Sequence, residues 1–183
     1  GPDQLRQRVA FALAQIMVIS AGKIGDPSAH TLWMNMMQND AFGNFSTLLK
    51  DVTLSPAMGN YLDMANNDGC TGCAPNENYA REVLQLFSIG LVQLNPDGTP
   101  QVDGSGVPLP SYDQDTIEGF AHTFTGWSYP PKPGKSASFY SEPYFSGPMV
   151  SFENHHDKGS KQLLNGTIVV AGGTAQADLD AAM

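Results

Sequence analysis

Apolar residues recur at spacings of three and four through the first half of the chain, which predicts a series of amphipathic helices. A first helix is expected over about residues 3–20, with an inward face made of Leu5, Val9, Leu13, Ile16 and Met17. Further helices are expected over residues 26–39, 44–52 and 55–64. Two of these open with Asp-Pro or Ser-Pro, the sequence of a capping residue followed by a proline in the first turn.

The stretch Ala74–Gly90 is expected to form the central helix of the protein. Pro75 suits the first turn, and Gly90 suits the position just after the last turn. Between them, an apolar stripe at helical spacing contains Tyr79, Val83, Leu86, Phe87 and Gly90. A buried stripe next to a dense group of polar residues is a suitable place for a functional site.

After Gly90 the pattern changes from helical to alternating and irregular. A short β-hairpin is expected over residues 91–110, a helix from Asp113 or Thr116 to Gly126, and a long irregular loop over residues 128–149. A strand-like piece follows at residues 149–152, and a second hairpin over residues 161–170 turns at Asn165-Gly166. The predicted fold is a mainly α, helical bundle-like single domain with one or two small β-hairpins and a long irregular loop.

Composition and charge exclude several partners. The chain has 18 acidic and 9 basic residues and a net charge of −9, so it lacks the cations that a run of phosphates would require. The basic residues are scattered, which also argues against an anionic membrane surface. No apolar run reaches the roughly 18 residues of a membrane span. The last predicted helix, capped by Thr174, is short, so residues 1–183 are expected to be one domain from a longer chain whose last helices are missing.

The polar part of the central stretch is the first candidate site. It contains Asn76, Glu77, Asn78, Arg81 and Glu82 within seven positions. Two carboxylates beside an arginine could have pKa values moved in opposite directions, as acid–base catalysis requires, and Glu82 could ligate a metal. The structural alternative is an ordinary helix pair between Glu77 and Arg81, four residues apart, within a buried polar network.

The second candidate site is His155-His156-Asp157. A histidine and a carboxylate can ligate a metal or act as a base and its orienting partner. Adjacent side chains point in different directions, however, so this segment alone cannot complete a coordination shell. A surface turn with a packed His156 is the alternative. His30 and His122 are both expected to pack.

Three segments give the chain a family resemblance. They are Pro75–Glu82 with the following Leu84, Leu86 and Phe87; Ala121–Trp127, which reads AHTFTGW; and His156–Lys161, which reads HDKGSK. With the opening Asp3–Val9 and the Leu54–Met58 step, the chain resembles the DUF1800 family over essentially its whole length. The resemblance implies a largely helical fold. It also implies a periplasmic or extracellular location, because members often carry an export signal and are usually longer. In that pattern His156-Asp157 has a counterpart and His155 does not.

The location that the resemblance implies affects the interpretation of Cys70 and Cys73. In an exported protein a local disulfide is the simpler explanation of C-x-x-C, and a zinc site would require two more ligands, for which His155 and His156 are the obvious supply. The family pattern does not require these cysteines.

The leading hypothesis is a hydrolase-like domain that acts on an extracellular polymer through an acid–base or metal site. Glu77 and Glu82 would be acid–base groups or ligands, Arg81 would orient an anion, and His156-Asp157 would complete the site from its loop, close enough to Glu82 to share a ligand or water. A divalent metal held by Glu82, His156 and Asp157 is the one cofactor considered. The alternative is a non-catalytic module that binds a polysaccharide or an extracellular protein through the aromatic residues of the 128–149 loop, which are Trp127, Tyr129, Phe139, Tyr140, Tyr144 and Phe145.

Overall fold

Helices build the N-terminal half of the protein. In the computed structural model, which describes residues 3–183, these are α1 (Gln4–Ile16), α2 (Pro27–Asn39), α3 (Phe45–Leu54) and α4 (Pro56–Tyr61). The side chains of Asp26 and Asn44 accept hydrogen bonds from the backbone N–H groups of Ser28 and Ser46, so the predicted cap of α2 is confirmed and α3 is capped in the same way. The cap predicted at Ser55 is wrong, because its side chain forms no capping hydrogen bond to α4. His30 bonds the carbonyl of Ile24 at 3.0 Å, as a packed histidine should.

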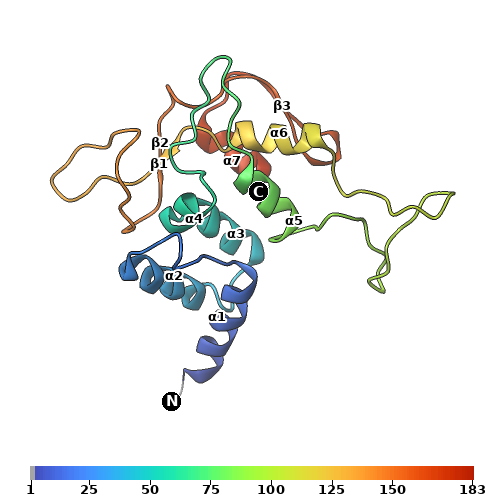
Figure 1. Ribbon diagram of the computed structural model, residues 1–183, viewed down its shortest axis with the longest axis horizontal. Helices are drawn as coiled ribbons and strands as arrows, with labels where there is room; N and C mark the ends of the chain where they lie inside the picture. The colour runs from blue at the N-terminus through green and yellow to red at the C-terminus, as the bar shows by residue number, and fades with distance from the viewer. Residues whose placement is uncertain (1–2) are drawn as a thin grey trace.

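The inward face predicted for α1 is partly wrong. Met17 is fully buried, but the exposed fractions of Leu5 and Ile16 are 67% and 52%. Helix α1 packs against α2 (Figure 1), and its contact face is centred on Ala10, the one residue of the helix that is buried. A small residue at this position allows the two helices to approach closely, which turns the flanking Leu5 and Ile16 toward solvent.

Helix α5 (Asn78–Gln85) is shorter than predicted. Pro75 lies before it, and the chain turns out of the helix four residues before Gly90, which has a φ of +74°. Tyr79, Val83 and Phe87 are buried as expected, whereas Leu86, predicted to belong to the same stripe, is 54% exposed.

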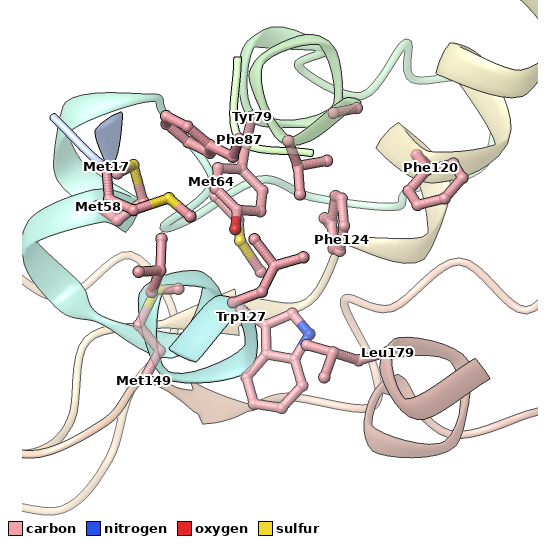
Figure 2. Packing of buried hydrophobic residues seen from close by; sticks show 14 of the residues in the cluster. Met17, Met58, Met64, Tyr79, Phe87, Phe120, Phe124, Trp127, Met149 and Leu179 are labelled. Atoms are coloured by element: carbon pink, nitrogen blue, oxygen red, sulfur yellow. The ribbon is translucent and has the colours of Figure 1, made fainter. Parts of the chain in front are cut away.

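The central position of α5 is confirmed by its packing. The ring of Tyr79 meets that of Phe124 edge-on at 5.0 Å, among Phe87 and Met64 (Figure 2). Its hydroxyl lies 2.5 Å from Thr53 Oγ1. Complete burial raises the pKa of Tyr79 well above its usual value, partly offset by this bond. The core therefore joins α5 to α3 and α6 through one aromatic side chain.

The C-terminal half contains α6 (Gln114–Thr123), α7 (Ala175–Ala182) and two small antiparallel hairpins. Strand β1 (Trp127–Ser128) pairs with β2 (Val150–Ser151), and β3 (Lys161–Gln162) pairs with β4 (Ile168–Val169). The second hairpin turns through η1 (Leu164–Gly166), where Asn165 and Gly166 both have positive φ, as predicted for an Asn-Gly turn.

Two segments leave this body (Figure 1). Residues 91–110 form a folded arm held by three isolated β-bridges, so the predicted hairpin is present without regular strands. Residues 129–149 form the predicted irregular loop. The fold is mainly α with small sheets, and the helices run in different directions, so we do not describe it as a bundle. Among residues 3–183, no helix combines the length and apolarity needed to cross a bilayer.

Candidate active site

The polar turn of α5 forms the predicted ion pair and extends it to α6. Arg81 Nη2 lies 2.5 Å from Glu77 Oε2, the i, i+4 pair that the spacing suggested. The same Nη2 donates to Gln114 Oε1 at 3.0 Å. Gln114 Nε2 then donates to Glu77 Oε1 at 3.2 Å and to Glu118 Oε1 at 3.1 Å. One amide therefore holds carboxylates from two helices, Glu77 at the start of α5 and Glu118 within α6.

A histidine–carboxylate pair lies one turn further along α6. His122 Nδ1 is 2.8 Å from Asp157 Oδ2, and the side chains are 36% and 22% exposed. An ionised carboxylate can only accept, so Nδ1 carries the proton and Nε2 is the basic nitrogen. Sequence analysis missed this role for His122. Glu118 and His122 are spaced to share one face of a helix, but no sequence pattern indicated that Asp157 would meet them.

Local contacts fix Asp157. Its N–H donates to Thr125 Oγ1 at 2.9 Å, and its Oδ1 accepts from the Gly159 N–H at 2.6 Å. Burial opposes ionisation of Asp157, but the bonds from Gly159 and His122 and the charge of Lys161 outweigh it, so the pKa of Asp157 lies below its usual value. The side chain is therefore an anion at neutral pH and can orient the imidazole.

Gly126 allows this segment to lie against the end of α6. Gly126 has a φ of +81°, and a Cβ on it would lie 2.9 Å from the backbone of His156. Only glycine satisfies both the left-handed backbone and the close approach. The Gly-Trp step after α6 is thus explained by the passage of residues 155–157 directly over it.

These groups meet at a cavity of about 320 Å³. Its lining combines the segment before α5 with one face of α6, and consists of Cys73, Ala74, Pro75, Glu77, Glu118, Ala121 and His122. Two carboxylates and an imidazole backed by a third carboxylate therefore border one small space. Such an arrangement can remove a proton at one point and donate one at another.

His156 occupies a different place from the one expected. Its side chain is fully buried, Nε2 lies 3.0 Å from Asp178 Oδ2, and Nδ1 lies 3.0 Å from the Thr125 carbonyl oxygen. Lys161 Nζ also donates to Asp178 Oδ2, at 2.7 Å. The hydrogen bonds of His156 thus go to α7 and to the turn after α6, and not to Glu82. As expected for neighbours in the chain, His156 and Asp157 point to different partners.

Glu82 is also separate from the His122 cavity. It does not line that cavity, and its Oε2 is buried without a hydrogen-bond partner within residues 3–183. Glu82 lies near Tyr112, whose pKa is raised by burial, lowered by the charge of Arg81 and raised by that of Glu82. In the part of the chain that the structure describes, no three His, Cys, Asp or Glu side chains are placed to hold a metal ion, so Glu82, His156 and Asp157 do not form a ligand set.

Much of the aromatic loop is packed inward. Trp127, Tyr129 and Phe139 are buried, so they are not available to stack on a ligand as the binding-module hypothesis required. His155 stacks on Phe139, with ring centroids 3.8 Å apart, and its Nδ1 lies 2.9 Å from Asp68 Oδ2. Cys70 and Cys73 are joined in a disulfide in the neighbouring loop, which confirms the simpler of the two explanations for C-x-x-C.

Comparison with known proteins identifies the family of this chain. The family model described as "Protein of unknown function (DUF1800)" matches residues 1–183. The chain belongs to the DUF1800 family. No curated protein and no solved structure matches it.

In this DUF1800 protein two of the three segments that carry the resemblance line the cavity, and the third supplies the carboxylate that bonds His122. Pro75–Glu82 supplies Glu77, Ala121–Trp127 supplies His122, and His156–Lys161 supplies Asp157. Segments up to 80 residues apart in the sequence therefore contribute to one polar region. Of the predicted site residues, Glu77 lines the cavity and Asp157 bonds the unpredicted His122.

Proposed function

We propose that this DUF1800 protein is a hydrolase whose base is the His122–Asp157 pair. The observation that carries the proposal is the 2.8 Å bond between His122 Nδ1 and Asp157 Oδ2 at the edge of a cavity that Glu77 and Glu118 also line. A carboxylate behind an imidazole holds the ring in one tautomer and stabilises the imidazolium that forms on proton uptake. The C-terminal end of α6 also stabilises the imidazolium, since a helix C-terminus favours a positive charge.

The reaction that fits these groups is attack by water on a polar bond of the substrate. His122 Nε2 takes a proton from water, and the oxygen forms the new bond to the substrate. As the scissile bond breaks, the imidazolium of His122 donates this proton to the leaving group, so that His122 is restored and overall one water is added across one bond.

Charge restricts the substrate. Glu77 and Glu118 line the cavity, Asp157 lies behind His122, Arg81 is engaged by Glu77, and the whole chain has a net charge of −9. An anionic group would therefore be repelled. We infer that the substrate is a neutral or cationic segment of a polymer and, because family members are often exported, that it is met in the periplasm or outside the cell.

The test is turnover on a panel of neutral and cationic polysaccharides and peptides, measured for the unaltered chain, His122→Asn and Asp157→Asn. Removal of a general base costs about 10²- to 10⁴-fold in kcat. The kcat of both variants should fall by that order, with little change in KM.

His155→Asn is a matched control. His155 makes a bond of similar length, 2.9 Å, to Asp68, but it stacks on Phe139 and does not line the cavity. This variant should retain full kcat. Equal loss in His155→Asn and His122→Asn, or full activity in His122→Asn, would show that the base is not His122.

A further inference from the structure

Two adjoining cavities lie where the end of the 129–149 loop passes α2. The first, of about 380 Å³, is lined mainly by apolar side chains of α2 and of the α3–α4 corner, including Trp33, Leu54 and Ala57. The second, of about 470 Å³, lies between the start of α2 and residues 143–146. Leu32 and Phe145 line both cavities, so together they form one groove.

The walls of this groove are held in place by the core. Trp33 and Ala57 are buried at its base. Phe145 packs edge-on against Tyr129, with ring centroids 6.4 Å apart, and the Tyr129 hydroxyl accepts a hydrogen bond from Asn60 at 2.8 Å. A groove with a fixed apolar base and a volume of several hundred cubic ångströms has the properties of a small-molecule site.

The charged groups of the groove have one sign. Asp51 lines the first cavity and Asp26 the second, and neither cavity is lined by Lys or Arg among the residues that the structure describes. Within those residues neither carboxylate forms an ion pair with a basic side chain. An apolar ligand that carries a positive charge would therefore gain attraction in addition to apolar burial.

A second carboxyl group distinguishes the end of the groove at Asp51 from the end at Asp26. The Asp40 carboxyl lies beside that of Asp51, and its Oδ2 is buried without a hydrogen-bond partner in residues 3–183. Burial and the charge of Asp51 raise the pKa of Asp40. A cation placed at Asp51 would offset the repulsion between the two carboxyls, whereas Asp26 at the other end is already engaged as the cap of α2.

We propose that this groove binds an organic cation with an apolar body. The ammonium group lies at Asp51, and the body runs over Trp33 and past Leu32 and Phe145 into the second cavity. The site is separate from the His122 cavity, with which it shares no lining residue, so it stands independently of the proposed hydrolysis.

The experiment compares three probes of equal chain length, octylammonium, octanol and octanoate, by titration at neutral pH. The chain has two tryptophans, so the two indole N–H signals in a nitrogen–proton correlation spectrum report separately on the groove (Trp33) and on the core (Trp127). Octylammonium should shift the Trp33 signal, leave that of Trp127 in place and bind more tightly than octanol, with octanoate the weakest. Equal affinities for the three probes, stronger binding of octanoate, or a shift of Trp127 alone would overturn the proposal.

Two conservative variants test which carboxylate lies next to the ammonium group of the ligand. Asp51→Asn should weaken the binding of octylammonium by about fivefold and leave the affinity for octanol unchanged, since one exposed ion pair is worth up to about 1 kcal/mol. Asp26→Asn is the matched control, because asparagine still caps α2, and it should change the affinity less than about twofold. A larger effect of Asp26→Asn than of Asp51→Asn would contradict the assignment of the ammonium group to Asp51.

Discussion

The buried charges around Asp178 give the sharpest test of how this fold is held together. The side chains of His156, Lys161 and Asp178 are at most 2% exposed, and Asp178 Oδ2 accepts from both of the others, at 3.0 Å and 2.7 Å. Asp178→Ala leaves the ammonium of Lys161 buried with only the carbonyl oxygens of Asp157 and Gly159 as partners. Removing one partner of a buried ion pair costs about 3–5 kcal/mol, a large part of a typical domain stability of about 5–15 kcal/mol.

Urea unfolding followed by circular dichroism measures this loss, and helix α7 provides its own control. Asp180 lies two residues further along and pairs with Lys50, but these side chains are 50% and 40% exposed. Asp180→Ala should therefore cost less than about 1 kcal/mol. The two variants remove the same side chain from the same helix, so helix propensity cancels and the difference reports burial of the charge.

A second change separates charge from packing. Adding Lys161→Met to Asp178→Ala removes the stranded cation and should recover part of the stability, since apolar replacements of buried ion pairs are often tolerated. Equal, small losses for Asp178→Ala and Asp180→Ala would refute the reasoning, as would a double variant less stable than Asp178→Ala alone.

Three further changes test other parts of the structure. Folding lowers the pKa of Asp157, so the stability that this carboxylate contributes is present above pH 3.8, its ordinary pKa, and is lost as the pH falls through the lower pKa of the folded state. Asp157→Asn should therefore flatten the acid limb of a plot of unfolding free energy against pH. An unchanged acid limb would contradict this. Gly126→Ala should lower the free energy of unfolding by about 2 kcal/mol or more, since the positive φ and the contact with His156 both exclude a Cβ; a thermal melt within 2 °C of the unaltered chain would exclude this strain. Tyr79→Phe should cost about 1 kcal/mol in urea unfolding through loss of the bond to Thr53, and no loss would mean that this bond contributes nothing.

Local features were predicted well because neighbouring residues decide them. The caps at Asp26 and Thr174, the Asn-Gly turn of the second hairpin and the irregular character of residues 129–149 all follow from side chains that act on their own backbone. The burial of Tyr79 also followed from its spacing with Val83 and Phe87.

The errors arose where a distant segment decides the outcome. Leu86 fits the apolar stripe of α5, but the helix ends at Gln85 and Leu86 is exposed. His156 and Glu82 were expected to share a site, yet His156 is committed to Asp178, twenty-two residues further along the chain. Helical spacing cannot reveal a partner that lies on another element.

The sequence by itself determined the helices, their caps, the acidic charge and three polar segments, because each depends on residues close together in the chain. The tertiary structure alone decided which polar groups meet. It places Asp157 against His122, which lines a cavity with Glu77, and it buries His156 and Lys161 against Asp178, although Asp157, His156 and Lys161 belong to one short segment. The reason is physical: side chains of adjacent residues diverge, and the close approach of the His156 backbone to Gly126 leaves His156 turned inward and Asp157 turned toward His122.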